Sequence, residues 1–305
     1  MDRLDHLELF TRIVEARSFA RAAQDLNVAR STATNVINRL ERDVGVRLLA
    51  RTTRHVAPTP EGEEFYLKAR NILAEVEDTY GSFASASPRG HLRIDAPGLL
   101  TRTFLVPCLP AFLARYPGLT LAFSQGDRFV NIVQDGVDCA LRAGHPEDST
   151  LKMRHLGELP EITCASPGYL ERHGTPRSFD ALDGHRMVGF VSSRTGEVMP
   201  LEFTGDGALH YRRVECPVST DNSDTAAALA RQGIGLIQAP QYRFAEDLAS
   251  GALVEVLAEH RPAPLPLNAI HAGDRMVSRR LEVFLDWVTE LFATRPDAPH
   301  GPGSG

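Results

Sequence analysis

The chain has 305 residues and a mass of 33.4 kDa, which is too long for one typical hydrophobic core and favours two or three domains. It contains no apolar run of about 18 residues, and its N-terminus is acidic where a signal peptide would be basic. We therefore expect a cytoplasmic protein with no membrane segment. The four cysteines are widely spaced without a C-x-x-C pair, so we expect no zinc site and no disulfide framework. We also expect no cofactor.

The charge is divided unevenly along the chain. The net charge is −6, but residues 1–58 hold ten arginines against seven acidic residues, whereas the remainder holds 23 basic and 32 acidic residues. A small basic head thus precedes an acidic body. This distribution favours a local contact with DNA, because affinity depends on charges placed at phosphates and not on the overall isoelectric point.

The head shows three helical patterns followed by a hairpin. Apolar residues from Leu4 to Val14 recur at steps of three and four, and Ser18 offers an N-cap for a second helix with a narrow alanine face. A third helix is predicted over residues 28–41, after a break at Asn27. Residues 46–49 and 55–57 are predicted to be the strands of a wing, joined by a turn at residues 51–54.

The third helix separates apolar from polar side chains. Its polar face carries arginine, asparagine and hydroxyl groups, and a helix in the major groove can use arginine for guanine and asparagine for adenine. The alternative is an ordinary surface helix. Arginines at the tip of the wing can reach phosphates or the minor groove. The candidate DNA-binding residues are Arg30, Ser31, Thr32, Thr34, Asn35, Asn38, Arg39, Arg51, Thr53 and Arg54.

This N-terminal region resembles the LysR-type transcriptional regulators. The resemblance is carried by the alanine-rich second helix (residues 18–23), by Gly45-Val46-Arg47-Leu48-Leu49 with the two arginines that follow, and by Thr59-Pro60-Glu61-Gly62. It implies a winged helix-turn-helix. Two positions depart from the family: Ala29 replaces a usual Ser or Thr, and Ser31 replaces a frequent Pro. Loss of the cap at Ala29 would cost about 1 kcal/mol locally.

A long helix is predicted from Thr59 to Phe83, because a capping hydroxyl, a proline and an acidic residue stand at its start. Its apolar stripe is longer than the head can cover. The stripe could pack on the chain's own second domain, but the resemblance favours pairing between subunits in a homodimer or homotetramer on a pseudo-palindromic operator. The candidate dimerisation residues are Phe65, Ala69, Ile72, Leu73, Val76 and Tyr80.

Beyond a hinge of small residues, the body alternates strands and helices, which indicates an α/β architecture. Strands are predicted at 92–96, 119–124, 139–142, 162–165, 218–220, 234–237 and 267–270. Helices are predicted at 104–116, 130–134, from 167, at 223–232 and at 277–292.

The body resembles the LysR effector domain, whose two α/β lobes are similar to periplasmic solute-binding proteins. The residues that carry this resemblance include 106–117, 135–144 and 233–240. The expected organisation is a head at 1–58, a linker helix at 59–83, a hinge at 84–91 and an effector domain at 92–295. Lobe I would hold about 92–161 and 266–295, and lobe II about 162–265. Residues 296–305 would be a disordered tail.

In such a fold a ligand binds between the lobes, beyond the carboxyl ends of strands. We expect a small organic acid, held by backbone N–H groups at helix starts and by an arginine. For Arg142, a structural ion pair with Asp138 or another neighbour is equally open. The candidate effector-binding residues are Thr101, Arg102, Ser124, Gln125, Arg142, Thr220, Asp221, Asn222 and Ser223.

Two other function classes compete with a regulator that binds double-stranded DNA. An enzyme is disfavoured because the sequence lacks a G-x-S-x-G elbow, a P-loop and an H-E-x-x-H motif. A free-standing solute-binding protein would leave the basic head unexplained. The resemblance also admits RNA polymerase as a partner.

Overall fold

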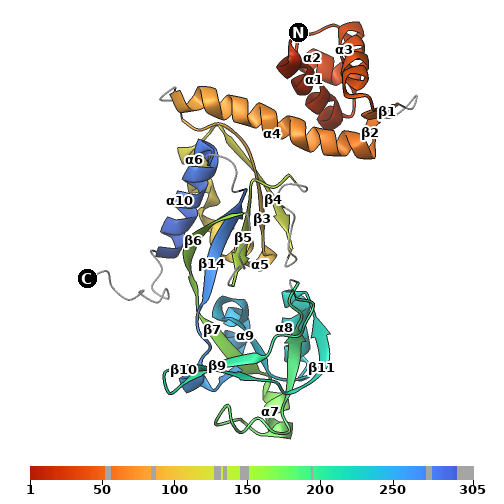
Figure 1. Cartoon of the computed structure of the whole chain (residues 1–305). Coiled ribbons are helices and arrows are strands. Elements are labelled where there is room, and N and C mark those ends of the chain that lie inside the picture. Colours follow the sequence, from red (N-terminus) through yellow and green to blue (C-terminus); the bar gives the residue numbers. More distant parts are fainter. Residues whose placement is uncertain are drawn as a thin grey trace.

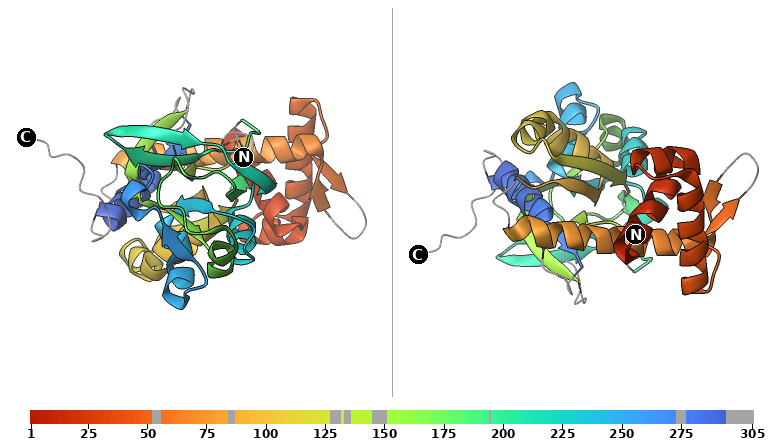
Figure 2. Two further views of the ribbon diagram at one scale, coloured as in Figure 1. Left: turned by 90° about the horizontal axis from the view of Figure 1, so that it is seen from below. Right: turned by 90° about the horizontal axis from the view of Figure 1, so that it is seen from above.

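The computed structural model describes residues 1–51, 56–83, 87–126, 132, 136–144, 151–193, 195–272 and 277–293. A small helical head is joined by one long helix to a body with two lobes (Figure 1). The long helix extends across the end of lobe I, and the head projects beyond the body at one side (Figure 2). None of the helices in these ranges is long and apolar enough to cross a bilayer.

The head is a three-helix core with a short two-stranded wing. Asp2 and Asp5 cap the first helix reciprocally, and the Ser18 hydroxyl caps the second as predicted. Phe10 and Ile37 are fully buried in the core between the helices. The elements are α1 (Arg3–Ala16), α2 (Phe19–Asp25), α3 (Arg30–Val44), β1 (Leu49–Arg51) and β2 (Val56–Pro58).

Two predicted boundaries in the head were wrong. The third helix starts two residues later than predicted and runs on to Val44, where Gly45 adopts a left-handed conformation with φ of 81°. The first wing strand begins at Leu49 instead of Val46, and its partner begins at Val56. Residues 46–48 form a loop because the N–H groups of Leu48 and Leu49 bond to a side chain of α3.

The linker helix α4 (Pro60–Phe83) agrees with its prediction. Thr59 caps it through a hydrogen bond from the Gly62 N–H to the hydroxyl, 3.0 Å long. Ala69 is 1% exposed in the core of the head, and the ring of Phe65 packs edge-on against Phe10 at 5.3 Å. The first half of the apolar stripe is therefore covered by the chain's own head, so Ala69, a candidate dimerisation residue, is not open to a partner helix.

Lobe I is built on a five-stranded sheet in the order β4-β3-β5-β14-β6. The first three of these strands in the sheet are parallel, so their carboxyl ends share one edge, and β14 runs antiparallel to both of its neighbours. Buried residues of α10 pack on this sheet. The strands are β3 (Gly90–Ala96), β4 (Leu119–Gln125), β5 (Cys139–Ala143), β6 (Lys152–Leu159) and β14 (Leu265–His271), and the helix is α10 (Arg279–Ala293).

The predicted helix at 104–116 is longer and less regular than expected. Helical structure begins directly after β3 with α5 (Gly98–Leu100), continues through a π-helical turn (Thr101–Leu105) and a 3-10 turn (Val106–Cys108), and ends with α6 (Leu109–Arg115). The predicted helix at 130–134 lies outside the described residues except for Ile132, and so does the tail. Strand β6 was not predicted.

Lobe II contains three small sheets, in the orders β12-β7-β13, β11-β8 and β10-β9. Strand β11 is parallel to β8, and helix α8 follows it directly. The elements are β7 (Glu161–Ala165), α7 (Pro167–His173), β8 (Arg186–Phe190), β9 (Leu201–Gly205), β10 (Ala208–Arg212), β11 (Glu215–Thr220), α8 (Ser223–Arg231), β12 (Ile237–Pro240), a 3-10 turn (Gln241–Phe244), α9 (Ala245–Ser250), β13 (Val254–Val256) and a 3-10 turn (Ala258–His260).

The predicted strand at 234–237 was placed too early. Gly233 ends the preceding helix in a left-handed conformation, with φ of 74°, as its predicted role as a stop requires. Leu236 makes an isolated bridge to Met187, and the strand proper starts only at Ile237. The chain passes between the lobes near Pro160, whose carbonyl accepts a hydrogen bond from the Gln241 N–H at 2.8 Å.

Candidate functional site

The outer face of α3 presents the polar side chains that the sequence predicted there. Arg30, Ser31, Asn35 and Asn38 are exposed, while Thr34 is half-buried and its hydroxyl donates back to a backbone carbonyl one turn earlier at 3.1 Å. The remaining two predicted residues of this helix are exposed as well: Thr32 and Arg39. The opposite face is buried and consists of Ala33, Val36, Ile37 and Leu40. The helix therefore packs by one face and offers the other to solvent.

The start of α3 has no side-chain cap. Ala29 occupies the N-cap position in an extended conformation and cannot accept a hydrogen bond through its side chain. The preceding Asn27 is left-handed, with φ of 58°, which turns the chain between α2 and α3. Backbone N–H groups at this helix start are thus left without the usual side-chain acceptor.

The wing is attached to α3 and α4 by hydrogen bonds. One carboxylate oxygen of Glu41 accepts from the N–H groups of Leu48 at 2.9 Å and Leu49 at 3.0 Å. The carbonyl of Leu48 in turn accepts from the Thr59 N–H at 3.0 Å. Gly62 lies so close to this carbonyl that a Cβ atom there would collide with it. These contacts hold α3, the wing and the start of α4 as one unit.

The wing contributes few described side chains to the candidate interface. Arg51 is the last residue of β1, and its side chain is outside the described part of the chain. Thr53 and Arg54 lie outside the described residues altogether.

The second half of the α4 stripe remains on the surface. Ile72 is 43% exposed and Tyr80 is 78% exposed, while Leu73 and Val76 are half-buried. Large apolar side chains in such positions are available to a second surface.

In lobe I, a buried ion pair occupies the carboxyl ends of the parallel strands. Asp95, at 3% exposure, forms an ion pair with Arg142 and accepts a hydrogen bond from the Ser124 hydroxyl at 2.6 Å. Of the two interpretations of Arg142, the structure shows an ion pair with a neighbour, which is Asp95 and not Asp138. The sequence analysis missed Asp95, although an acidic residue inside an otherwise apolar strand was a signal for it.

Three further side chains lie near the start of the helical segment after β3. Thr101 is 2% exposed, sits inside this segment and donates its hydroxyl to the Pro97 carbonyl at 3.1 Å, so it does not stand at a helix start. A Cβ atom on Gly98 would lie 2.8 Å from the side-chain oxygen of Gln125 and 3.2 Å from a guanidinium nitrogen of Arg102. Gln125 and Arg102 therefore converge on Gly98.

In lobe II, the predicted residues surround the start of α8. Thr220 accepts a hydrogen bond from the Asn222 N–H at 3.1 Å, and the Asn222 side chain caps α8 by accepting from the Thr225 N–H at 2.9 Å. Ser223 is the first residue of the helix, and Asp221 is half-buried beside it. This turn brings α8 toward lobe I.

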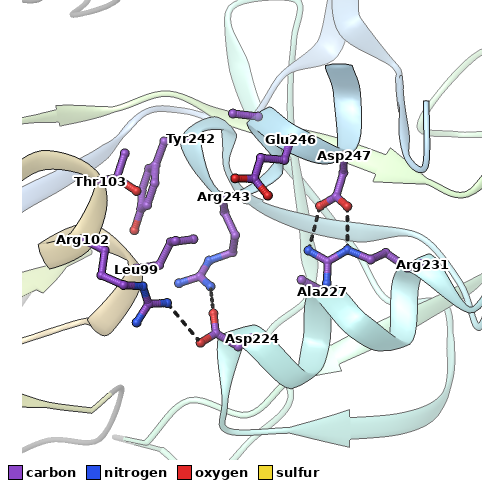
Figure 3. A pocket seen from close by; sticks show the side chains of 11 residues that line it. Leu99, Arg102, Thr103, Asp224, Ala227, Arg231, Tyr242, Arg243, Glu246 and Asp247 are labelled. Atoms are coloured by element: carbon purple, nitrogen blue, oxygen red, sulfur yellow. Dashed lines mark hydrogen bonds and ion pairs between the residues drawn. The ribbon is translucent and has the colours of Figure 1, made fainter. Parts of the chain in front are cut away.

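A cavity of about 370 Å³ lies between the two lobes (Figure 3). Lobe I contributes the segment Leu99–Thr103, and lobe II contributes one face of α8 and the segment from Tyr242 to Asp247. The ring of Tyr242 also packs against Phe104 of lobe I at 4.8 Å. The lining residues are Leu99, Arg102, Thr103, Asp224, Ala227, Arg231, Tyr242, Arg243, Ala245, Glu246 and Asp247.

Ion pairs cross this cavity and line its wall. Asp224 bonds to Arg243 at 2.8 Å and lies 4.0 Å from Arg102, which belongs to the other lobe. Arg231 forms two hydrogen bonds with Asp247, at 2.6 and 2.9 Å, and this hydrogen bonding raises the pKa of the arginine. Of the cavity residues, the sequence analysis had named Arg102 alone as a candidate. The lining residues from lobe II lie more than 120 residues farther along the chain.

Comparison with known proteins places both parts of the chain in one family. Residues 4–63 match "Bacterial regulatory helix-turn-helix protein, lysR family", and residues 85–293 match "LysR substrate binding domain". The regulator YhjC of Escherichia coli is 35% identical over 291 residues, covering 94% of this chain and 97% of that protein. A transcriptional repressor of Pseudomonas aeruginosa is 31% identical, covering 97% and 94%.

A solved structure extends this likeness to three dimensions. CrgA, a LysR-type regulator from Neisseria meningitidis, has a TM-score of 0.58 and 32% identity, covering 95% of this chain and 99% of that one. Because the two family matches together span nearly all the described residues, and the relatives align along almost their full length, the chain belongs to the LysR-type transcriptional regulators, with a helix-turn-helix DNA-binding domain and a two-lobed effector domain.

Proposed function

We propose that this protein is a cytoplasmic homodimer or homotetramer whose affinity for a pseudo-palindromic operator is changed by a small organic acid bound between the two lobes. The observation that carries the proposal is the cavity of about 370 Å³, with the guanidinium of Arg102 in its lobe I wall. Its volume is in the range of small-molecule sites, and arginine is the side chain best suited to a carboxylate.

Arg102 is the cation of this cavity that a ligand can reach most easily. Its side chain is 56% exposed, and within the described part of the chain its only ion pair is the long contact of 4.0 Å with Asp224. Arg142, in contrast, is 13% exposed and held by the buried Asp95, so we assign it a structural role. A ligand on Arg102 would also touch lobe II across the cavity.

That contact with both lobes provides a route to regulation. A ligand shifts a conformational equilibrium only through its different affinity for two arrangements, and a site between lobes has different contacts when the lobes move. Helix α4 joins the head of each chain to its lobe I. In a dimer, the arrangement of the lobes would therefore set the spacing of the two recognition helices.

The proposal assigns base reading to the exposed face of α3. Asn35→Ala or Arg30→Ala should relax the preference at particular base pairs by about 1–3 kcal/mol each. Arg51→Ala and Arg54→Ala, in the wing, should weaken binding to all sequences and lower the salt slope by about one unit each. Footprinting and salt titration distinguish the two roles, and unchanged base preferences in both α3 variants would remove the assignment.

The effector part is tested by a thermal-shift screen of small organic acids, since a ligand that binds only the folded state raises its unfolding temperature. An acid that raises it should also change operator affinity in a mobility-shift assay. Arg102→Gln should abolish both effects, whereas Arg213→Gln, at a side chain 76% exposed and remote from the cavity lining, should not. An acid that binds Arg102→Gln as tightly as the parent protein contradicts the proposal.

A further inference from the structure

The cavity between the lobes has balanced charges. Three arginines and three carboxylates line it: Arg102, Arg231, Arg243, Asp224, Glu246 and Asp247. A site that binds only an anion is expected to have an excess of positive charge, because a carboxylate in its wall repels the ligand. The equal number of positive and negative side chains in the wall therefore bears on which charges the ligand carries.

Four of these six charges satisfy one another within lobe II. Arg231 and Asp247 form a two-pronged pair, and the Asp247 side chain is 8% exposed. Arg243 is 6% exposed and bonds to Asp224 at 2.8 Å. Breaking either pair would leave a largely buried charge without its partner, so these pairs belong to the fixed wall of the cavity.

The remaining two charges have opposite signs and come from opposite lobes. Arg102 is exposed and stands 4.0 Å from Asp224, which keeps Arg243 as a closer partner if Arg102 turns to a ligand. Glu246, at the start of α9, is exposed, and its carboxylate makes no ion pair or hydrogen bond with any other described residue, only a longer-range electrostatic attraction to Arg231. Figure 3 shows both side chains at the cavity, with Tyr242 and Leu99 among the residues there.

From this arrangement we infer that the ligand is a zwitterion, a small acid that also carries an ammonium group, with its carboxylate on Arg102 and its ammonium on Glu246. Leu99, Ala227 and the ring of Tyr242 provide apolar surface for a short carbon chain between the two charged ends. A plain carboxylate would leave Glu246 with only its longer-range attraction to Arg231. The inference rests on the proposed function, because it specifies the ligand of the same cavity.

The test measures binding of two matched ligand series to the full-length protein by calorimetry. One series is the ω-amino acids from glycine to 6-aminohexanoate, and the other is the straight-chain carboxylates of the same lengths. We expect at least one amino acid to bind about tenfold or more tightly than its matched carboxylate, as an additional ion pair out of bulk solvent allows. Glu246→Gln should remove that advantage, and Glu171→Gln, at an exposed glutamate of α7, should leave it intact.

The outcomes separate the inference from the proposed function. Carboxylates that bind as tightly as their amino acids, and equally to the parent protein and Glu246→Gln, overturn the inference but leave the proposed function standing. Alkylamines that bind as tightly as the amino acids also overturn it, since the carboxylate would then have no role at Arg102. If neither series nor any other small acid binds, both proposals fail. The unfolding temperature of each variant without ligand verifies that it is folded.

Discussion

The side chain of Glu41 attaches the wing to α3 through its carboxylate, so substitutions at Glu41 test this attachment directly. Its oxygen accepts from the N–H groups of Leu48 and Leu49, whose side chains are 0% and 2% exposed. Hydrogen bonds to a charged acceptor contribute about 1.5–3 kcal/mol each. Glu41→Gln keeps a weaker, neutral acceptor, so we expect local opening of the wing to become easier by about 1.4 kcal/mol. Glu41→Ala removes the acceptor and should cost about 3 kcal/mol.

Amide hydrogen exchange measures this effect locally, whereas a global unfolding curve would mix several domains. Exchange at the Leu48 and Leu49 amides should accelerate about tenfold in Glu41→Gln and about a hundredfold in Glu41→Ala, since each 1.4 kcal/mol is a factor of ten. Asp43→Asn is the matched control, because that side chain is 62% exposed and its pair with Arg39 is 3.9 Å long. Unchanged exchange at both amides in Glu41→Ala would refute the reasoning.

Three further predictions concern the linker helix α4 and strand β7. Gly62→Ala should destabilise the head by about 3 kcal/mol in thermal unfolding, because the new methyl group collides with the Leu48 carbonyl. Ile72→Asp should lower the oligomer mass in light scattering, because the exposed half of the α4 stripe would gain charges that repel. Burial, reinforced by the Glu202 carboxylate, raises the pKa of Glu161 to about 8, above an unfolded value of about 4.3. The stability that its protonation contributes is full below about pH 4 and is lost as the pH rises through 8, so Glu161→Gln should raise the unfolding temperature more at pH 9 than at pH 5.

Each of these has a control that isolates its cause. Gly168→Ala, where a Cβ atom meets open space, should leave stability nearly unchanged. Ile72→Leu keeps the apolar surface and should keep the oligomer, and a persistent oligomer in Ile72→Asp would assign the stripe to internal packing. Glu171→Gln should show no gain at high pH, and an equal gain for Glu161→Gln at both pH values would contradict the raised pKa.

Local sequence determined the helices and their caps. Ser18 caps α2 through its own hydroxyl, Thr59 and Pro60 start α4, and Gly233 ends α8 in the left-handed conformation that glycine adopts without strain. The buried and exposed faces of α3 also follow from sequence, since side chains three and four positions apart share a face of a helix.

Tertiary contacts decided the features that local patterns could not. The wing strand starts at Leu49 and not at Val46 because the Glu41 carboxylate, seven and eight residues away, takes the N–H groups that precede and open the strand. Arg142 is paired with Asp95, 47 residues away in the sequence, only because the sheet places β3 beside β5.

The cavity between the lobes shows most clearly what local sequence can predict and what long-range packing decides. Sequence identified Arg102 as a candidate because it follows the first strand of the body, but Asp224 and Glu246 had no local pattern that marked them as its neighbours. They meet only because two lobes, each folded from separate stretches of chain, bring these stretches face to face. Periodicity reports which side of an element is buried, whereas the partner across a cavity is set by long-range packing, which no short stretch of sequence contains.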